Sequence, residues 1–220
     1  MCPLLPIRKP LLCYVTDRRS LAADTAFAKA ILLDNMERAT KAGVDWIQLR
    51  EKDLSGRELA ELAATALQCV GAGSRLLIND RLDVAVAIGG AGVHLGEHSL
   101  PVAEARRFVK ERCPGREFLI GVSTHSVQAA QEAETGGADY VIFGPIFATP
   151  SKADFGIPQG LAKLSQVCER VKIPVLAIGG ITTENARECL NAGASGIAAI
   201  RLFQDAPDLQ AAVARLREKA

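Results

Sequence analysis

Three residues at the centre of one short stretch have types and spacing that could bind an anionic substrate. Gln48, Arg50 and Lys52 alternate along the chain, so an amide and two cations can lie on the same side of it. Arginine and lysine are effective ligands for phosphate groups. The stretch therefore predicts a site for a phosphorylated molecule, although both cations could instead pair with the neighbouring Glu51 and Asp53.

Asn79 and Asp80 follow the next apolar run and offer hard oxygen donors. Such donors suit Mg²⁺ that is held together with substrate phosphates. The same residue types are favoured at the start of a helix, so capping of a helix near Leu82 is an equal interpretation. His94 and His98 are four residues apart but lack the H-E-x-x-H pattern, and we do not expect both to bind a metal.

Hydroxyl groups and a histidine follow a later run. Ser123 and Thr124 could donate hydrogen bonds to phosphate oxygens, and His125 could act as an acid or a base near neutral pH. The alternative for these residues is a cluster that caps a helix beside a surface histidine.

Residues 144–156 form an unusually long connection, and long connections in compact domains are often functional. Two hydroxyls and a cation in it suit a diphosphate: Thr149, Ser151 and Lys152. Further along, the backbone N–H groups near Gly180 and Ile200 could bind phosphate at turns that open helices, or they could belong to ordinary structural turns.

Eight short apolar runs precede these polar turns, and helical patterns separate them. The runs cover residues 11–15, 44–49, 76–78, 92–95, 118–122, 140–143, 175–178 and 196–200. Runs without strict alternation are typical of parallel strands that are covered on both faces. The repeated pattern predicts a single-domain α/β protein, a (β/α)₈ or TIM barrel, with its site at the carboxyl ends of the strands. An open doubly wound sheet is the alternative, but no G-x-G-x-x-G follows the first run.

Several helix boundaries are also marked. Ser55 and Glu58 form a capping-box pattern, and Gly71 would end the helix that follows. Ser126 and Thr182 are expected to cap two later helices. We expect residues 1–10 to be an N-terminal extension and residues 11–220 to form the barrel.

Composition sets broad limits on function. The formal net charge of +1 gives no reason to expect nucleic acid or a membrane as a partner, and homo-oligomerisation stays open. The six cysteines show no C-x-x-C pairing and suit the reducing cytoplasm. The first residues lack the apolar core of a signal peptide, and no apolar run is long enough for a membrane helix. We therefore predict a cytoplasmic protein that binds small molecules.

Between about residue 11 and residue 203 the chain resembles the thiamine-phosphate synthase family. The motifs that carry the resemblance occur in the family's order, at residues 14–17, 48–52, 78–80, 92–96, 121–123, 144–147 and 178–182. Together these motifs are specific for a superfamily that also contains the thiazole tautomerases of thiamine biosynthesis.

The resemblance implies a transferase that joins a hydroxymethylpyrimidine diphosphate to a thiazole phosphate and releases diphosphate. The implied ligands of the pyrimidine diphosphate are Gln48, Arg50 and Lys52, with Asn79 contacting substrate and Asp80 binding Mg²⁺. The implied ligands of phosphate groups are Ser123, Thr149, Ser151 and Lys152, together with the backbone of Gly180 and Ile200 for the thiazole phosphate. The residues expected to take part in catalysis are Arg50, His125 and Lys152.

Some positions depart from the family pattern. Where the family has a second Mg²⁺-binding aspartate, this chain has Ser99, after Glu97 and His98. The loss of one carboxylate is expected to weaken Mg²⁺ binding, although Glu97 could compensate. Arg201 replaces the serine that usually follows Ile200. Ser151 replaces a threonine and keeps the hydroxyl.

The departures leave three functions open. They resemble the tautomerase branch, an isomerase that needs no metal and uses a histidine at the position of His125 as acid and base. Lys52 and Asp80 favour the synthase, because a metal-free isomerase has little use for them. A non-catalytic barrel that binds phosphorylated ligands is the third alternative.

Overall fold

The computed structural model of the chain describes residues 10–149 and 157–218. Two of the predicted phosphate ligands, Ser151 and Lys152, lie outside the described residues.

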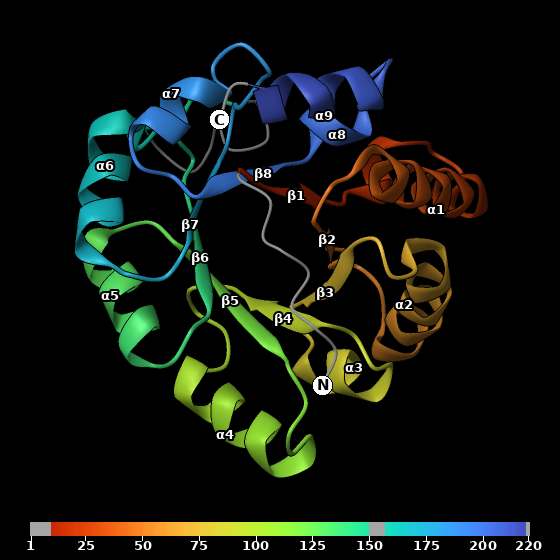
Figure 1. The fold of residues 1–220 in the computed structure, drawn as a ribbon. Helices are drawn as coiled ribbons and strands as arrows, with labels where there is room; N and C mark the ends of the chain where they lie inside the picture. The colour runs from red at the N-terminus through yellow and green to blue at the C-terminus, as the bar shows by residue number, and fades with distance from the viewer. Residues whose placement is uncertain (1–9, 150–156, 219–220) are drawn as a thin grey trace.

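The strands form a closed parallel barrel in which each strand pairs with the next and β8 pairs with β1 (Figure 1). They are β1 (Leu11–Val15), β2 (Trp46–Leu49), β3 (Arg75–Asn79), β4 (Gly92–Leu95), β5 (Leu119–Thr124), β6 (Tyr140–Phe143), β7 (Val175–Ile178) and β8 (Gly196–Ala199). The predicted (β/α)₈ architecture is therefore confirmed, and the open sheet is wrong.

Helices surround the barrel on its outside (Figure 1). They are η1 (Arg18–Ser20), α1 (Thr25–Ala42), α2 (Gly56–Val70), α3 (Leu82–Ala87), α4 (Val102–Arg112), α5 (Val127–Thr135), α6 (Gly160–Arg170), α7 (Ala186–Asn191), α8 (Arg201–Gln204) and α9 (Leu209–Glu218). Among the helices of the described ranges, none combines the length and the apolar character that crossing a lipid bilayer requires.

The strands are apolar on both faces because each face packs in a different core. In β1, Leu11, Cys13 and Val15 point into the barrel, where they join Trp46 and Tyr140. The other face of each strand packs under the helices in a larger cluster. This double burial is the reason that the strands appear in the sequence as apolar runs without strict alternation.

Gly121 makes room for the ring of Tyr140 inside the barrel. The ring centroids of Trp46 and Tyr140 lie 4.6 Å apart, and the Tyr140 ring lies against Gly121. A Cβ atom at position 121 would be 2.0 Å from Cζ of Tyr140. The small residue and the large one are therefore complementary across β5 and β6.

Local signals predicted some helix starts well and one poorly. The capping box of Ser55 and Glu58 is present, and the Ser126 side chain accepts from the N–H of Ala129. Thr182 does not cap α7, which begins only at Ala186. Its hydroxyl accepts instead from the N–H of Asn185 at 3.4 Å and stabilises the turn before the helix.

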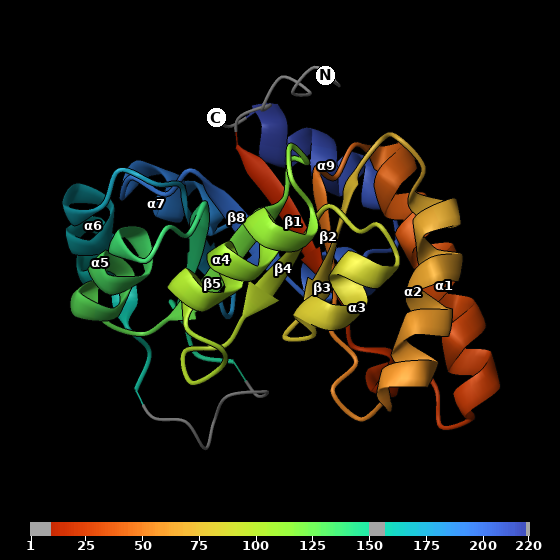
Figure 2. The ribbon, with the colours of Figure 1, turned by 90° about the horizontal axis from the view of Figure 1, so that it is seen from below.

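Side chains from the last two helices contact the two ends of β1. Arg217 on α9 donates to the carbonyls of Pro10 and Gly43 and to Asp45. In the view of Figure 2, α9 lies beside the start of β1. At the opposite end of β1, the Tyr14 hydroxyl donates to Oε1 of Gln204 at 2.9 Å.

Candidate active site

Polar side chains from four neighbouring strands meet at the carboxyl ends of the strands. Nε2 of Gln48 donates to Oδ1 of Asn79 at 2.9 Å, across β2 and β3. His94 pairs with Asn79 in the register of β3 and β4 and contacts Ser123 on β5. The barrel thus brings together the residues predicted at these strand ends.

The side-chain amide oxygen of Gln48 is buried without a hydrogen-bond donor in the part of the chain that the structure describes. The residue is only 3% exposed, and its Oε1 atom has no hydrogen-bond donor among the described residues. A buried acceptor without a donor costs about 1–3 kcal/mol, so such an atom is unusual unless a ligand satisfies it. This feature supports the predicted role of Gln48 in substrate binding.

His94 links Tyr140 to Ser123 inside the barrel. Nδ1 of His94 lies 3.1 Å from the Tyr140 hydroxyl, and Nε2 lies 2.9 Å from Oγ of Ser123. Burial, together with the nearby positive charge of Arg50, lowers the pKa of His94 to about 3, so the ring is neutral at pH 7. Burial also raises the pKa of Tyr140 well above its usual range. We therefore assign the Tyr140 hydroxyl as donor to Nδ1 and Nε2–H as donor to Ser123, which leaves the serine proton free for a phosphate oxygen.

Burial of neutral His94 makes stability depend on pH. The unfolded residue has a pKa near ~6.5, so between that value and about 3 the unfolded chain binds the extra proton. Stability is therefore lost as the pH falls through this window, by roughly 2 kcal/mol at pH 5 from this residue. We expect urea unfolding between pH 7.5 and 5 to show this loss in the wild type and a flatter profile in His94→Gln. Parallel profiles for the two proteins would contradict the assignment, and His98→Gln, at an exposed position, serves as control.

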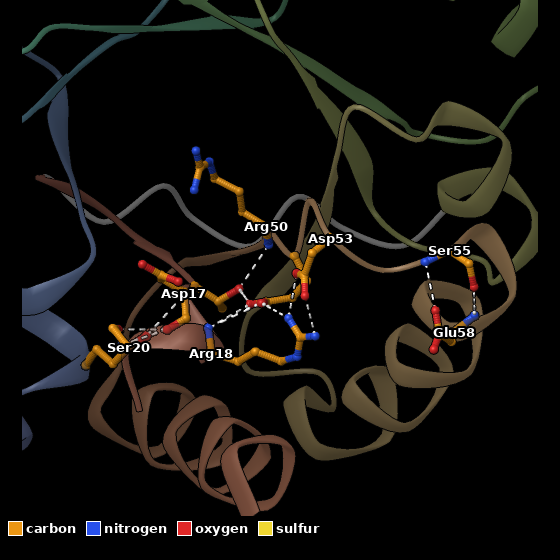
Figure 3. A network of polar contacts seen from close by, with 10 residues as sticks. Asp17, Arg18, Ser20, Arg50, Asp53, Ser55 and Glu58 are labelled. Atoms are coloured by element: carbon orange, nitrogen blue, oxygen red, sulfur yellow. Dashed lines mark hydrogen bonds and ion pairs between the residues drawn. The ribbon is translucent and has the colours of Figure 1, made fainter. Parts of the chain in front are cut away.

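The acids next to Arg50 and Lys52 are engaged by a different cation. Both carboxylate oxygens of Asp53 accept from Arg18, each at 2.7 Å, and Glu51 accepts from the same guanidinium at 3.2 Å. In Figure 3 the Arg50 side chain extends away from these carboxylates. Within the described ranges, neither Arg50 nor Lys52 forms an ion pair. The alternative of local pairing is therefore wrong.

Arg50 and Lys52 instead line a hollow beside the barrel mouth. Its volume is about 590 Å³, and its other lining residues are Asp17, Arg19, Ser20, Glu51 and Asp53. A hollow of this size accommodates a small ligand. Three cations therefore lie together beside the ends of β1 and β2: Arg19, Arg50 and Lys52.

Asp80 occupies a strained turn and has a free carboxylate. Its φ is +64°, and the N–H of Arg81 donates to the carbonyl of Asn79 at 2.8 Å, which closes a three-residue turn around it. Such a turn is rare and costs energy in a residue other than glycine. Helix α3 has no side-chain cap, so the capping interpretation is wrong. Asp80 is exposed, and no residue of the described ranges hydrogen-bonds to its carboxylate.

Two glycines follow β7, where phosphate binding was predicted. Gly179 and Gly180 have φ of +99° and +65°, and a Cβ at position 180 would lie 2.6 Å from the carbonyl oxygen of Ala148. Only glycine fits there without strain. Ile200 precedes α8, and its carbonyl accepts from the N–H groups of Phe203 and Gln204, so the N–H groups of Arg201 and Leu202 have no acceptor within the helix. Thr149 is half-buried at the described end of the connection after β6.

Comparison with known proteins identifies the family. The model of the thiamine monophosphate synthase family matches residues 12–203. The chain belongs to this family. It is 47% identical over 182 residues to the thiamine-phosphate synthase of Methanoculleus marisnigri, covering 82% of this chain and 84% of the relative. It is 39% identical to that of Roseiflexus castenholzii, over 98% of this chain and 90% of the relative.

A solved structure agrees with these sequence relatives. The thiamine phosphate pyrophosphorylase from Pyrococcus furiosus superposes with a TM-score of 0.78 at 36% identity, over 96% of both chains. The names of these relatives favour the transferase over the isomerase and over a non-catalytic barrel.

Ser99, where the resemblance predicts a second metal-binding aspartate, forms hydrogen bonds within its own turn. Its hydroxyl accepts from the N–H of Gly96 at 3.0 Å, and its own N–H donates to the Gly96 carbonyl at 3.1 Å. Ser99 therefore stabilises a turn after β4. Glu97 in the same turn lies 3.9 Å from Nε2 of His125, measured to Oε2.

Few carboxylates are available for a metal, but Mg²⁺ needs few. No group of three or more His, Cys, Asp or Glu residues in the described ranges could hold a metal ion. Mg²⁺ usually keeps several waters and is held by one or two carboxylates with substrate phosphates. The free, exposed carboxylate of Asp80 at the strand ends fits that mode of binding.

His125 is held by the connection that follows β6. Its Nδ1 lies 2.5 Å from the carbonyl oxygen of Gly144, so Nδ1–H donates and Nε2 faces Glu97. The side chain is 40% exposed. The predicted acid–base role of His125 stays a prediction.

Sequence reasoning missed three residues that organise the site. Arg18 was not among the candidates, although an arginine three residues after the inferred strand end at Val15 is a usable signal. Tyr140 appeared only as part of an apolar run. Gln204 lies in a helix, and nothing in the sequence marks its contact with Tyr14.

Proposed function

We propose that the chain condenses a hydroxymethylpyrimidine diphosphate with a thiazole phosphate and releases thiamine phosphate and diphosphate, with the help of Mg²⁺. The observation that carries the proposal is the pairing of Glu51 and Asp53 with Arg18, which leaves Arg50 and Lys52 available at the strand ends. A diphosphate is the substrate group that two cations beside a free carboxylate can hold together with a metal.

In the proposed reaction, Arg50 and Lys52 bind the diphosphate, and the Ser123 hydroxyl donates to one of its oxygens. The bond between the methylene carbon and the diphosphate oxygen breaks, and the leaving group takes the electron pair. The cations then stabilise the charge that develops on it. Asp80 would hold Mg²⁺ with the diphosphate oxygens, and the ion would add positive charge there. The thiazole nitrogen supplies the electron pair for the new bond.

The other predicted residues complete the proposed site. Oε1 of Gln48 accepts a hydrogen bond from the pyrimidine substrate, and its amide holds Asn79 in place. The thiazole phosphate binds the backbone of Gly180 and Ile200. Thr149, Ser151 and Lys152 bind phosphate oxygens. In this proposal Lys152 also supports departure of the diphosphate.

The test is formation of thiamine phosphate by the purified protein from the two substrates over a range of Mg²⁺ concentrations. We expect product that depends on Mg²⁺. Absence of product at every Mg²⁺ concentration would overturn the proposal. Turnover of a thiazole carboxylate phosphate in that case would identify an isomerase instead.

Ser99→Asp should restore a second carboxylate at the site. One aspartate oxygen can accept from Gly96 N–H as the serine does, and the other is then available for the metal. Because added carboxylate charge strengthens the binding of divalent cations, we expect the Mg²⁺ concentration at half-maximal activity to fall about 10-fold. Ser99→Asn, which has the same shape without the charge, is the control. Equal Mg²⁺ dependence in the two variants would exclude position 99 from the metal site.

We also propose that the protein works in the cytoplasm. The cysteines of the described ranges are free thiols: Cys13, Cys69, Cys113, Cys168 and Cys189. Burial raises the pKa of Cys13 and Cys189 to about 12, which keeps these thiols protonated and unreactive. Free thiols suit a reducing compartment.

A further inference from the structure

Arg18 is a buried cation that binds both acids flanking Lys52. Its side chain is 7% exposed and that of Glu51 is 1% exposed. Two parallel hydrogen bonds of 2.7 Å join its guanidinium to Asp53, and a third bond of 3.2 Å joins it to Glu51. Figure 3 shows Arg18 reaching across from the end of β1 to the segment that follows β2. The β1 end and the β2 end are therefore connected through charged groups.

Thr16 links the same carboxylate to the backbone of Arg50. Its hydroxyl donates to Oε1 of Glu51 at 2.6 Å and accepts from the N–H of Arg50 at 2.9 Å. The N–H of Arg18 also donates to both oxygens of Glu51, at 3.2 Å each. The direction of the Glu51 side chain is thus fixed by hydrogen bonds to Thr16 and Arg18.

The segment that carries Arg18 is itself anchored to the helix that follows β8, the neighbour of β1 in the barrel. Oε1 of Gln204 accepts from the N–H of Asp17 at 3.2 Å, and its Nε2 donates to Asp17 O at 3.1 Å and Ser20 Oγ at 2.7 Å. Gln204 belongs to α8, directly after β8. These three hydrogen bonds fix the position of the segment that carries Arg18.

The pairing with Arg18 changes the net charge of the segment that carries Arg50 and Lys52. Without Arg18, the two positive charges of Arg50 and Lys52 would be balanced by the two negative charges of Glu51 and Asp53. With Arg18 bound to the acids, the local sum is one positive charge. The two cations that face the hollow also lose their nearest competing anions. An anionic ligand is therefore attracted to a segment that would otherwise be neutral.

We propose that Arg18 is a positioning residue for diphosphate binding: it pairs with the carboxylates of Glu51 and Asp53, so that Arg50 and Lys52 are left to bind the substrate. This inference rests on the proposed function for the identity of the anion. A lysine could not replace Arg18 fully, because only the planar guanidinium can engage Asp53 with two bonds and Glu51 with a third.

The first experiment measures binding of inorganic diphosphate with Mg²⁺ to the whole protein by calorimetry. We expect Arg18→Met to raise the Kd about 10- to 100-fold, as expected for a residue that supports charged ligand groups, and Arg18→Lys to lie between it and the wild type. In turnover assays the KM for the pyrimidine diphosphate should rise by a similar factor, and the KM for the thiazole phosphate should change less than about 2-fold.

The matched control is Arg106→Met. Arg106 also binds one aspartate, Asp139, at 2.5 Å, as well as the carbonyl of Gly137, but it lies at the opposite end of the strands. Its loss should lower the melting temperature without changing the Kd for diphosphate. Equal Kd values for the wild type and a folded Arg18→Met would overturn the inference.

A second variant tests whether Arg18 acts by neutralising the charge of the two acids or only by holding the segment after β2 in place. Asp53→Asn cuts the strongest link to Arg18 but also removes a competing anion, and the Asp53 side chain is 40% exposed, so the change is tolerated structurally. We expect its Kd for diphosphate to stay within about 2-fold of the wild type, and Asp53→Asn with Glu51→Gln to restore binding in Arg18→Met. A loss of binding in Asp53→Asn as large as in Arg18→Met would contradict the charge argument.

The two proposals fail in different ways. A wild-type protein that binds diphosphate but forms no product would refute the synthase and leave the role of Arg18 intact. A wild-type protein that does not bind diphosphate would overturn the role of Arg18.

Discussion

Replacing Asp80 by asparagine is expected to lower kcat/KM at saturating Mg²⁺ by about 10²- to 10³-fold, with the free energy of unfolding changed by less than about 0.5 kcal/mol. Asparagine has nearly the same shape as aspartate and tolerates the φ of +64° found at this position. The variant therefore keeps the turn and loses only the charge that would hold Mg²⁺ against the diphosphate. Steady-state kinetics and urea unfolding measure the two quantities.

Asp80→Gly also separates the effect of the carboxylate on activity from its effect on stability. Glycine adopts positive φ without strain, so we expect this variant to be as stable as the wild type or up to about 1 kcal/mol more stable, yet as inactive as Asp80→Asn. The control is Asp83→Asn, at a nearby exposed acid that pairs with Arg81. More than a tenth of wild-type activity in Asp80→Asn would remove Asp80 from the metal site.

Gly121→Ala is expected to destabilise the protein by about 3 kcal/mol or more, the upper range for overpacking a core. The added methyl group would lie 2.0 Å from Cζ of Tyr140, and the ring cannot swing aside because Trp46 lies against it. A displaced Tyr140 would also release His94 from its hydrogen bond. Activity should therefore fall together with stability, as measured by urea unfolding and turnover.

A second substitution tests this explanation. Tyr140→Leu by itself leaves a cavity, but combined with Gly121→Ala it should cost clearly less than the sum of the two single changes. Gly136→Ala is the matched control, because its new methyl group would meet nothing nearer than 3.1 Å. Additive losses for Gly121 and Tyr140 would show that the two residues are not complementary.

The barrel could be predicted because each strand leaves a local signature. Double burial produces an apolar run, and eight runs with helical patterns between them fit few other folds. The errors lie where polar residues continue a strand. β5 extends to Thr124, two residues beyond the predicted end, because Ser123 is held at the barrel mouth by His94. Thr182 failed as a cap because the two glycines before it begin a turn of their own.

The sequence names candidate residues for the site, but it does not show how their side chains connect. Pairing of Arg50 with the adjacent Glu51 was the alternative that the sequence left open, and the structure pairs Glu51 with another cation. The partner of Glu51 is Arg18, which is 33 residues away, and Tyr14 finds Gln204 at a separation of 190 residues. The first contact depends on the pairing of β1 with β2 and the second on closure of the barrel by β8, and no local pattern encodes either. The left-handed turn at Asp80 is likewise set by the tertiary structure.

The junction between β1 and β8 has a consequence for the order of events during protein synthesis. β1 leaves the ribosome before the other strands of the barrel, yet one of its edges is paired only by β8, and the end of β1 is held by Gln204. While the intervening 180 or so residues are being made, that edge has no partner from the barrel and is a site for mispairing or chaperone binding. The segment that carries Arg18 also acquires its anchor only when Gln204 has been added. In a nascent chain that has not reached Gln204, the segment after β1 therefore lacks the hydrogen bonds that hold it in the folded protein.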